Sequence, residues 1–334
     1  MFSSTDIIDL VRQHAAGDRA KFVARVECMA ANCEKTSLKT AQTLRRMVGQ
    51  QPQSMTLMPI GGEASGMLTQ EFPSIAMTDV VLAATTRERI DRLLLEQREA
   101  AKLREHGLEP ARKVLFTGPP GVGKTMTAQA IATELGIGLC RVQLHAVIKS
   151  HLGETAANLA KLFDSLRGMR RVVLFDEFDA ICPDRGDARD DVGEMRRTVN
   201  SLLQFIESDR TDSVIIAATN YPEVLDRAVF RRFDELIAFD LPDTSQLARL
   251  ASSALGEFAS GLELWAAVST CPGISHAILV QACQQAMKDA VLAGRNRVAG
   301  VDLAAQLADR SAKQVMGNER NSHDGDHIPQ GCQS

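Results

Sequence analysis

The chain lacks a long apolar run and is poor in aromatic residues, and both absences limit what it can be. Only 4% of its 334 residues are aromatic, with a single Trp and a single Tyr. No stretch of about 18 apolar residues occurs, so we expect no transmembrane helix and no insertion into a membrane. The first residues show neither a basic flank nor an apolar core, so we expect no signal peptide.

A strong net charge and paired cysteines are also missing. The formal net charge is −4 and the isoelectric point is about 6.0, which argues against nucleic-acid binding as the main function. The seven cysteines are odd in number and form no C-x-x-C pair, a pattern typical of reduced thiols in a cytoplasmic protein. The length of 334 residues predicts two to three domains.

The strongest signal that is present is a glycine-rich run at residues 118–125, GPPGVGKT, which fits the pattern G-x-x-x-x-G-K-[ST]. A β-forming run at 113–117 precedes it and a helix-forming run at 126–132 follows it, the context in which backbone N–H groups hold phosphate oxygens. Lys124 is expected to reach the β- and γ-phosphates of ATP, and Thr125 to help hold Mg²⁺. The residues expected to bind the nucleotide here are Pro120, Gly121, Val122, Gly123, Lys124, Thr125 and Met126.

Two further apolar runs end in polar residues suited to hydrolysis. Residues 171–175 lead into Asp176 and Glu177, which at a strand's carboxyl end would lie in the ligand crevice of an open α/β sheet. Asp176 suits a contact to Mg²⁺ through a water molecule, and Glu177 suits polarising the water that attacks the γ-phosphorus. Residues 213–219 lead into Asn220, whose amide could hold that water. On their own these residues would indicate solvated loop positions or a turn.

Together the motifs resemble the AAA clade of the AAA+ ATPase superfamily, to which katanin and spastin belong. The resemblance runs from about residue 80 to 294 and rests on Walker A, on Walker B at 174–181, and on the sensor-1 and second-homology segment at 218–226. It implies a P-loop α/β fold: a parallel sheet with helices on both faces, followed by a small helical lid. It also implies ATP and Mg²⁺ as ligands of a ring-shaped oligomer, usually a hexamer.

Four more positions take their roles from this resemblance. Arg231 and Arg232 match the arginine fingers that act on the ATP of a neighbouring subunit, where a guanidinium offsets phosphoryl charge. Without the resemblance, two adjacent arginines would indicate surface salt bridges. Val80 and Val81 match the apolar contact to adenine.

The resemblance also identifies a pore loop and a turn of the lid, each with an unusual histidine. The segment that projects into the ring's pore and grips polypeptide has His151 in its aromatic position, followed by Leu152 and Gly153. An exposed loop histidine with no special role is the open alternative. In the lid turn, His276 replaces the usual small residue and would lie near the adenine or ribose.

The pattern along the chain predicts five parts. They are an N-terminal helical region for partner or substrate docking at 1–50, a linker at 51–75, a large ATPase subdomain at 76–242, a helical lid at 243–316 and a disordered tail at 317–334. Within the large subdomain the predicted strands are 113–117, 138–144, 171–176, 213–218 and 235–240.

The leading function is Mg²⁺-dependent ATP hydrolysis in a ring-shaped homo-oligomer that remodels, unfolds or translocates a protein substrate. Small bacterial AAA proteins with this layout resemble ATPases paired with a subtilisin-like peptidase, which implies a separate protease as partner in a bacterial defence system. Two alternatives stay open. A DNA-directed AAA+ ATPase of the initiator or loader type would show salt-dependent DNA binding, and a nucleotide-gated scaffold would turn over little ATP.

Overall fold

The computed structural model describes residues 58–59, 66–148, 154–168, 170–181, 189–259 and 263–323. Several predictions lie outside these residues. They are the helical region at 1–50, most of the linker up to residue 65, the pore loop at His151, Leu152 and Gly153, and the tail from residue 324 onward.

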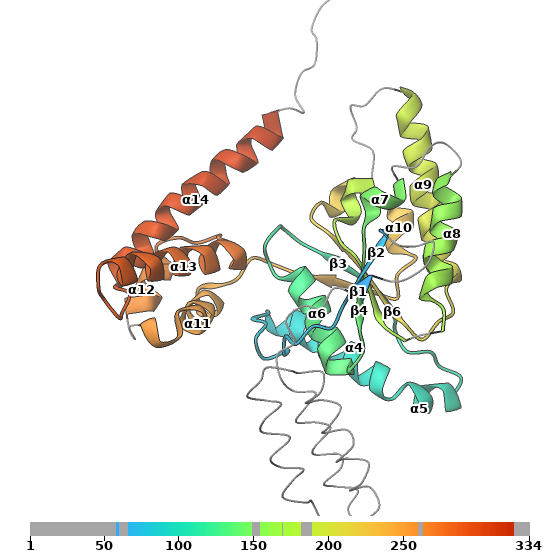
Figure 1. Ribbon diagram of the computed structural model, residues 1–334, viewed down its shortest axis with the longest axis horizontal. Helices are drawn as coiled ribbons and strands as arrows, with labels where there is room; N and C mark the ends of the chain where they lie inside the picture. Colours follow the sequence, from blue (N-terminus) through green and yellow to red (C-terminus); the bar gives the residue numbers. More distant parts are fainter. Residues whose placement is uncertain are drawn as a thin grey trace, which may run out of the picture. The chain divides into compact units, whose positions relative to one another are not determined.

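A seven-stranded sheet organises the ATPase core, in the order β1-β2-β4-β5-β6-β3-β7 (Figure 1). Strands β4, β5, β6, β3 and β7 are parallel, whereas β2 runs antiparallel to both of its neighbours. The strand bounds are β1 Met58–Pro59, β2 Leu68–Glu71, β3 Lys113–Thr117, β4 Leu139–Val142, β5 Val172–Phe175, β6 Val214–Thr219 and β7 Glu235–Ala238. The five predicted strands are confirmed, and each boundary agrees within two residues.

Helices cover both faces of this sheet, as the P-loop α/β prediction requires (Figure 1). One face packs on α4 (Ala84–Arg98) and α6 (Lys124–Leu135), and the other on α7 (Leu144–Ile148), α8 (Glu154–Leu166) and α9 (Arg189–Ser208). The inner strands read as continuous apolar runs because both of their faces are buried. Short elements complete this part: α5 (Ala100–Glu105), η1 (Phe178–Ile181), η2 (Pro222–Val224) and α10 (Arg227–Phe230).

The lid is helical and has a core of its own. It contains α11 (Thr244–Leu255), η3 (Gly256–Phe258), α12 (Glu263–Ser269), α13 (His276–Leu292) and α14 (Gly300–His323). Asp243 starts α11 with a capping box, in which its carboxylate accepts from the backbone of Gln246 and the Gln246 side chain accepts from the backbone of Asp243. Within the described ranges, every helix is too short or too polar to cross a membrane.

Two predicted boundaries are wrong in part. Residues 68–71, assigned to the linker, form β2, which pairs with β4 along its whole length. The signal was weak because the strand is short and buries the charged Glu71 together with the apolar Leu68. Residues 317–323, assigned to the tail, continue α14 to His323. Extending an existing helix costs far less than starting one, so polar residues can follow its folded first turns.

Candidate ATP-binding site

The glycine-rich loop joins β3 to α6, and its glycines are required by geometry. Gly118, Gly121 and Gly123 have φ angles of 142°, 77° and 97°, a region that glycine adopts readily. A Cβ atom on Gly118 would lie 2.1 Å from the carbonyl oxygen of Phe239, and one on Gly121 would lie 2.7 Å from Ser275 Oγ. The loop runs directly into the amino-terminal end of α6, and backbone N–H groups at that end favour an anion.

Lys124 is the buried centre of this loop. Its ammonium group donates to the carbonyl oxygens of Gly118 and Pro119, at 2.6 and 2.8 Å, and to Asn220 Oδ1 at 2.8 Å. Burial lowers the pKa of Lys124 to about 8. The contact to Asn220 joins the P-loop to the end of β6, so two predicted site residues from distant segments meet here.

This lowered pKa predicts that ATP binding weakens at alkaline pH. Below pH 8 Lys124 is charged and attracts phosphate, and above pH 8 the free protein loses that charge. We expect the apparent Kd for ATP to rise about tenfold between pH 7 and pH 9. Titration with a fluorescent ATP analogue at each pH measures this. The variant Lys124→Arg should show no such change because its guanidinium stays charged. A pH-independent Kd in the unaltered protein would contradict the prediction.

Thr125 and Asp176 form the predicted metal pair. Asp176 directly follows β5, and Thr125 Oγ1 donates to its Oδ2 atom over 2.8 Å. A hydroxyl and a carboxylate oxygen side by side are hard ligands of the kind that Mg²⁺ takes beside substrate phosphates. The residues present therefore fit a magnesium ion. Arg141, on β4, also donates to Asp176 Oδ2, over 3.3 Å.

Glu177 lies exposed beside this pair and has an unusual backbone. Its φ of 52° is positive, which no other non-glycine residue in the described ranges shows. Such conformations cost energy and gather at functional sites. Its N–H donates to Asp176 Oδ1 over 3.1 Å, and the N–H of Asn220 donates to Asp179 Oδ1 over 2.9 Å. The segment after β5 thus holds both Glu177 and Asn220 in place.

The lid contacts the P-loop at Gly121. The N–H of Ala277, in the first turn of α13, donates to the carbonyl oxygen of Gly121 over 3.0 Å. Both ring nitrogens of His276 are buried, and the backbone of Val81 is the polar group beside them among the described residues. Burial lowers the pKa of His276, while the adjacent backbone of Val81 partly offsets this. His276 therefore lies beside Val81, as an adenine site built from both residues requires.

Three of the predicted nucleotide-binding residues differ in their exposure. Pro120 and Met126 are exposed, at the loop and in the first turn of α6. The side chain of Val122 is buried in the core beneath the loop. Val122 can therefore offer a ligand its backbone only.

The two predicted arginine fingers lie away from this site. Both precede β7, which runs parallel to β3, whereas the P-loop follows β3, so they lie at the opposite edge of the sheet. The Arg231 side chain is exposed and has no ion pair among the described residues. Arg232 is half-buried and forms an ion pair with Glu207 near the end of α9.

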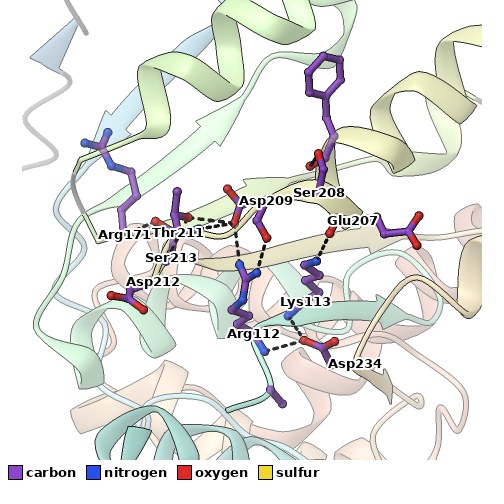
Figure 2. A network of polar contacts seen from close by, with 12 residues as sticks. Arg112, Lys113, Arg171, Glu207, Ser208, Asp209, Thr211, Asp212, Ser213 and Asp234 are labelled. Atoms are coloured by element: carbon purple, nitrogen blue, oxygen red, sulfur yellow. Dashed lines mark hydrogen bonds and ion pairs between the residues drawn. The ribbon is translucent and has the colours of Figure 1, made fainter. Parts of the chain in front are cut away.

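A polar network anchors the segment that carries these arginines (Figure 2). The backbone N–H groups of Arg112 and Lys113 donate to Asp234 Oδ2 over 3.0 and 2.9 Å. The Lys113 ammonium group donates to the carbonyl oxygen of Glu207 over 2.7 Å, and Arg112 pairs with Asp209 over 2.6 Å. This network ties the start of β7 to the end of α9. It therefore fixes the backbone on which the arginine pair stands.

Some polar residues of the site were not predicted. They are Glu71, Gln129, Arg141 and Asp179, together with Glu207 beside the arginine pair. One of them left a signal in the sequence, because Arg141 is the one charged residue of the predicted strand at 138–144.

A phosphate-binding loop between β3 and α6, with two carboxylates at the end of β5, defines a P-loop nucleotide-binding protein. Residues 114–241 match the model of the ATPase family associated with various cellular activities (AAA). The uncharacterized AAA family ATPase y4kL of Sinorhizobium fredii (strain NBRC 101917 / NGR234) is 35% identical over 290 residues, which cover 84% of this chain and 88% of that protein. The chain therefore belongs to the AAA family, and it is an ATPase.

The ATPase core is also similar to parts of much longer proteins. The peroxisomal ATPase PEX6 of Saccharomyces cerevisiae is 38% identical over 144 residues, which are 41% of this chain and 14% of that protein. The PEX6 of Candida glabrata is 34% identical over 181 residues, which are 52% of this chain and 18% of that protein. The chain thus spans less than a fifth of either PEX6 protein.

Proposed function

We propose that ATP is hydrolysed where the P-loop, β5 and β6 meet, with Mg²⁺ held by Thr125 and, through water, by Asp176. The observation that carries this proposal is the double contact between distant segments, Lys124 to Asn220 and Thr125 to Asp176. A bound magnesium ion would neutralise phosphate charge. Lys124 would hold the phosphate oxygens, and Glu177 would accept the proton of the attacking water.

Four other residues complete the proposed site. Asn220 would orient the attacking water, and its position at the end of β6 beside Lys124 supports this role. Val81 and His276 would bind the adenosine part, with Val80 contributing apolar contact. The support is that the buried ring of His276 lies beside the backbone of Val81.

The proposed active form is a ring-shaped homo-oligomer, most simply a hexamer, in which Arg231 and Arg232 reach the ATP of a neighbour. The support is their place at the sheet edge opposite the P-loop of the same chain. Arginines at the amino end of β7 lie toward the end of the sheet away from their own P-loop, which suits them to complete the site of the next subunit. Such a finger offsets charge on the transferring phosphoryl group.

The proposed work of the ring is to remodel, unfold or translocate a protein substrate in the cytoplasm, with a separate protease as partner in a bacterial defence system. Its support is the resemblance of the layout and of the segment His151, Leu152 and Gly153 to polypeptide-gripping AAA proteins. The described cysteines are free and buried, which fits a reducing compartment.

A pore-loop substitution tests the remodelling proposal. If His151 grips polypeptide by stacking, a permanently unfolded protein such as carboxymethylated lactalbumin should raise the ATPase rate. His151→Ala should then lower the ratio of stimulated to unstimulated rate by about 2- to 10-fold, the size of one lost stacking contact. His151→Phe should preserve or raise that ratio. His106→Ala, which removes an exposed histidine beyond α5, serves as the matched control. Full stimulation of His151→Ala would show that this residue does not grip.

A further inference from the structure

The Arg141 guanidinium lies between two carboxylates, one of them in the proposed metal site. Its Nε atom is 3.3 Å from Glu71 Oε1, and its Nη1 atom is 3.3 Å from Asp176 Oδ2. The Glu71 side chain is only 6% exposed, and those of Arg141 and Asp176 are 26% and 23% exposed. These charges are therefore partly shielded from water. Shielded charges affect their neighbours more strongly than charges on an open surface do.

These contacts form a closed circuit through the P-loop helix. Gln129 Nε2 donates to Glu71 Oε2 over 3.2 Å, and Thr125 Oγ1 donates to Asp176 Oδ2 over 2.8 Å. Thr125 and Gln129 are four residues apart on α6, so both side chains lie on one face of that helix. The circuit thus joins β2, β4, the end of β5 and α6. Arg141 is its only positive charge.

The charge arrangement has a consequence for Asp176. A positive group beside a carboxylate that faces a metal ion competes with that ion. Glu71 weakens the competition of Arg141 with the metal for Asp176, because Glu71 binds the same guanidinium. Removing the Glu71 charge would leave Asp176 as the sole carboxylate partner of Arg141. Removing the Arg141 charge would free Asp176 from this ion pair and leave Lys124 as a charge that still acts on it.

We propose that Arg141 is a positioning residue that acts on the magnesium site through Asp176, because it competes with the metal for that carboxylate, and that Glu71 sets how strongly it competes. The chain would then fix its Mg²⁺ requirement through a charge pair on β2 and β4. This inference rests on the metal role proposed above for Thr125 and Asp176. It predicts that loss of the two partners shifts the Mg²⁺ requirement in opposite directions, whereas simple structural damage would shift it one way.

The test measures nucleotide binding, so that it does not depend on turnover. In a Glu177→Gln background, binding of a fluorescent ATP analogue is titrated with MgCl₂. Glu71→Gln should raise the half-maximal Mg²⁺ concentration about 3- to 10-fold, and Arg141→Met should lower it by a similar factor, as expected for partly exposed charges. The double variant should match Arg141→Met, because Glu71 acts on Asp176 only through Arg141. Arg141→Lys, which keeps the charge, should shift it less than Arg141→Met.

An ion pair between α4 and the far end of α6 supplies the control. Arg98 pairs with Glu134 over 2.9 Å near the carboxyl end of α6, nine residues beyond Thr125 and roughly 14 Å along the helix. Arg98→Met and Glu134→Gln make the same charge changes there, beyond the usual screening length, and should leave the Mg²⁺ midpoint unchanged. Thermal unfolding of every variant verifies that it is folded.

The possible results distinguish the proposed role of Arg141 and Glu71 from the proposed magnesium site itself. Opposite shifts of the two variants, absent from the control pair, would support the inference. If Mg²⁺ improves binding in the parent but the variants do not shift, or shift in the same direction, the inference is wrong and the metal site stands. If Mg²⁺ does not affect binding in the parent, the proposed metal site fails and the inference fails with it.

Discussion

Replacing Arg231 by Ala is expected to lower the ATPase rate by about 10³- to 10⁵-fold while ATP binding is retained. The Arg231 side chain is exposed and unpaired among the described residues, so it is available to a neighbour's phosphates. Arg232→Ala should also abolish hydrolysis, and it breaks the pair with Glu207 in addition. Steady-state phosphate release and binding of a fluorescent ATP analogue measure the two effects. Arg227→Ala, which removes an exposed arginine in the adjacent helix α10, is the matched control.

Mixed oligomers test whether Arg231 acts on a neighbour. A subunit with Arg231→Ala keeps its own Glu177, and a subunit with Glu177→Gln keeps its own Arg231. Neither is expected to hydrolyse ATP at an appreciable rate alone, but an interface that combines the two intact residues should recover activity. No recovery in oligomers shown to contain both subunits would contradict action in trans.

Replacing Glu177 by Gln is expected to separate ATP binding from hydrolysis. The amide cannot accept the proton of the attacking water, so the rate should fall by about 10²- to 10⁴-fold with binding intact. Lys124→Ala should instead remove binding, because the buried ammonium group at the loop is lost. Equilibrium binding and single-turnover hydrolysis distinguish the two variants. Glu223→Gln, at an exposed glutamate of η2, controls for the loss of a carboxylate. Turnover by Glu177→Gln at the unaltered rate would exclude Glu177 as the base.

The parts of the site that the sequence predicts are those encoded locally. The P-loop, the carboxylates after β5 and Asn220 each follow an apolar strand directly, so strand, loop and polar residue are read from one short window. Parallel strands then bring their carboxyl ends to the same edge of the sheet, and this explains why Lys124 meets Asn220 across 96 positions of sequence. The same logic predicts the strands themselves.

The parts that were missed depend on contacts without a local pattern. Strand β2 is four residues long and has neither an apolar run nor clear alternation. Its Glu71 acquires meaning only beside Arg141, 70 positions away. Glu207 is likewise one exposed acidic residue among many until the fold brings Arg232 to it. Nothing in the composition of these segments distinguishes a charge-sharing circuit from an ordinary surface charge.

The approach of the lid to Gly121 has a consequence for how related sequences can vary. A Cβ atom on Gly121 would lie 2.7 Å from Ser275 Oγ and 2.9 Å from the Cβ atom of Ala277, so the bulk allowed in the loop depends on the bulk present in the lid. Relatives with a larger residue at position 121 should carry smaller residues at both 275 and 277 or a shifted start of α13, and they must also adopt a different φ at position 121. Covariation between a phosphate loop and a lid helix 156 positions apart would then reflect steric fit, and neither position need touch the nucleotide through its side chain.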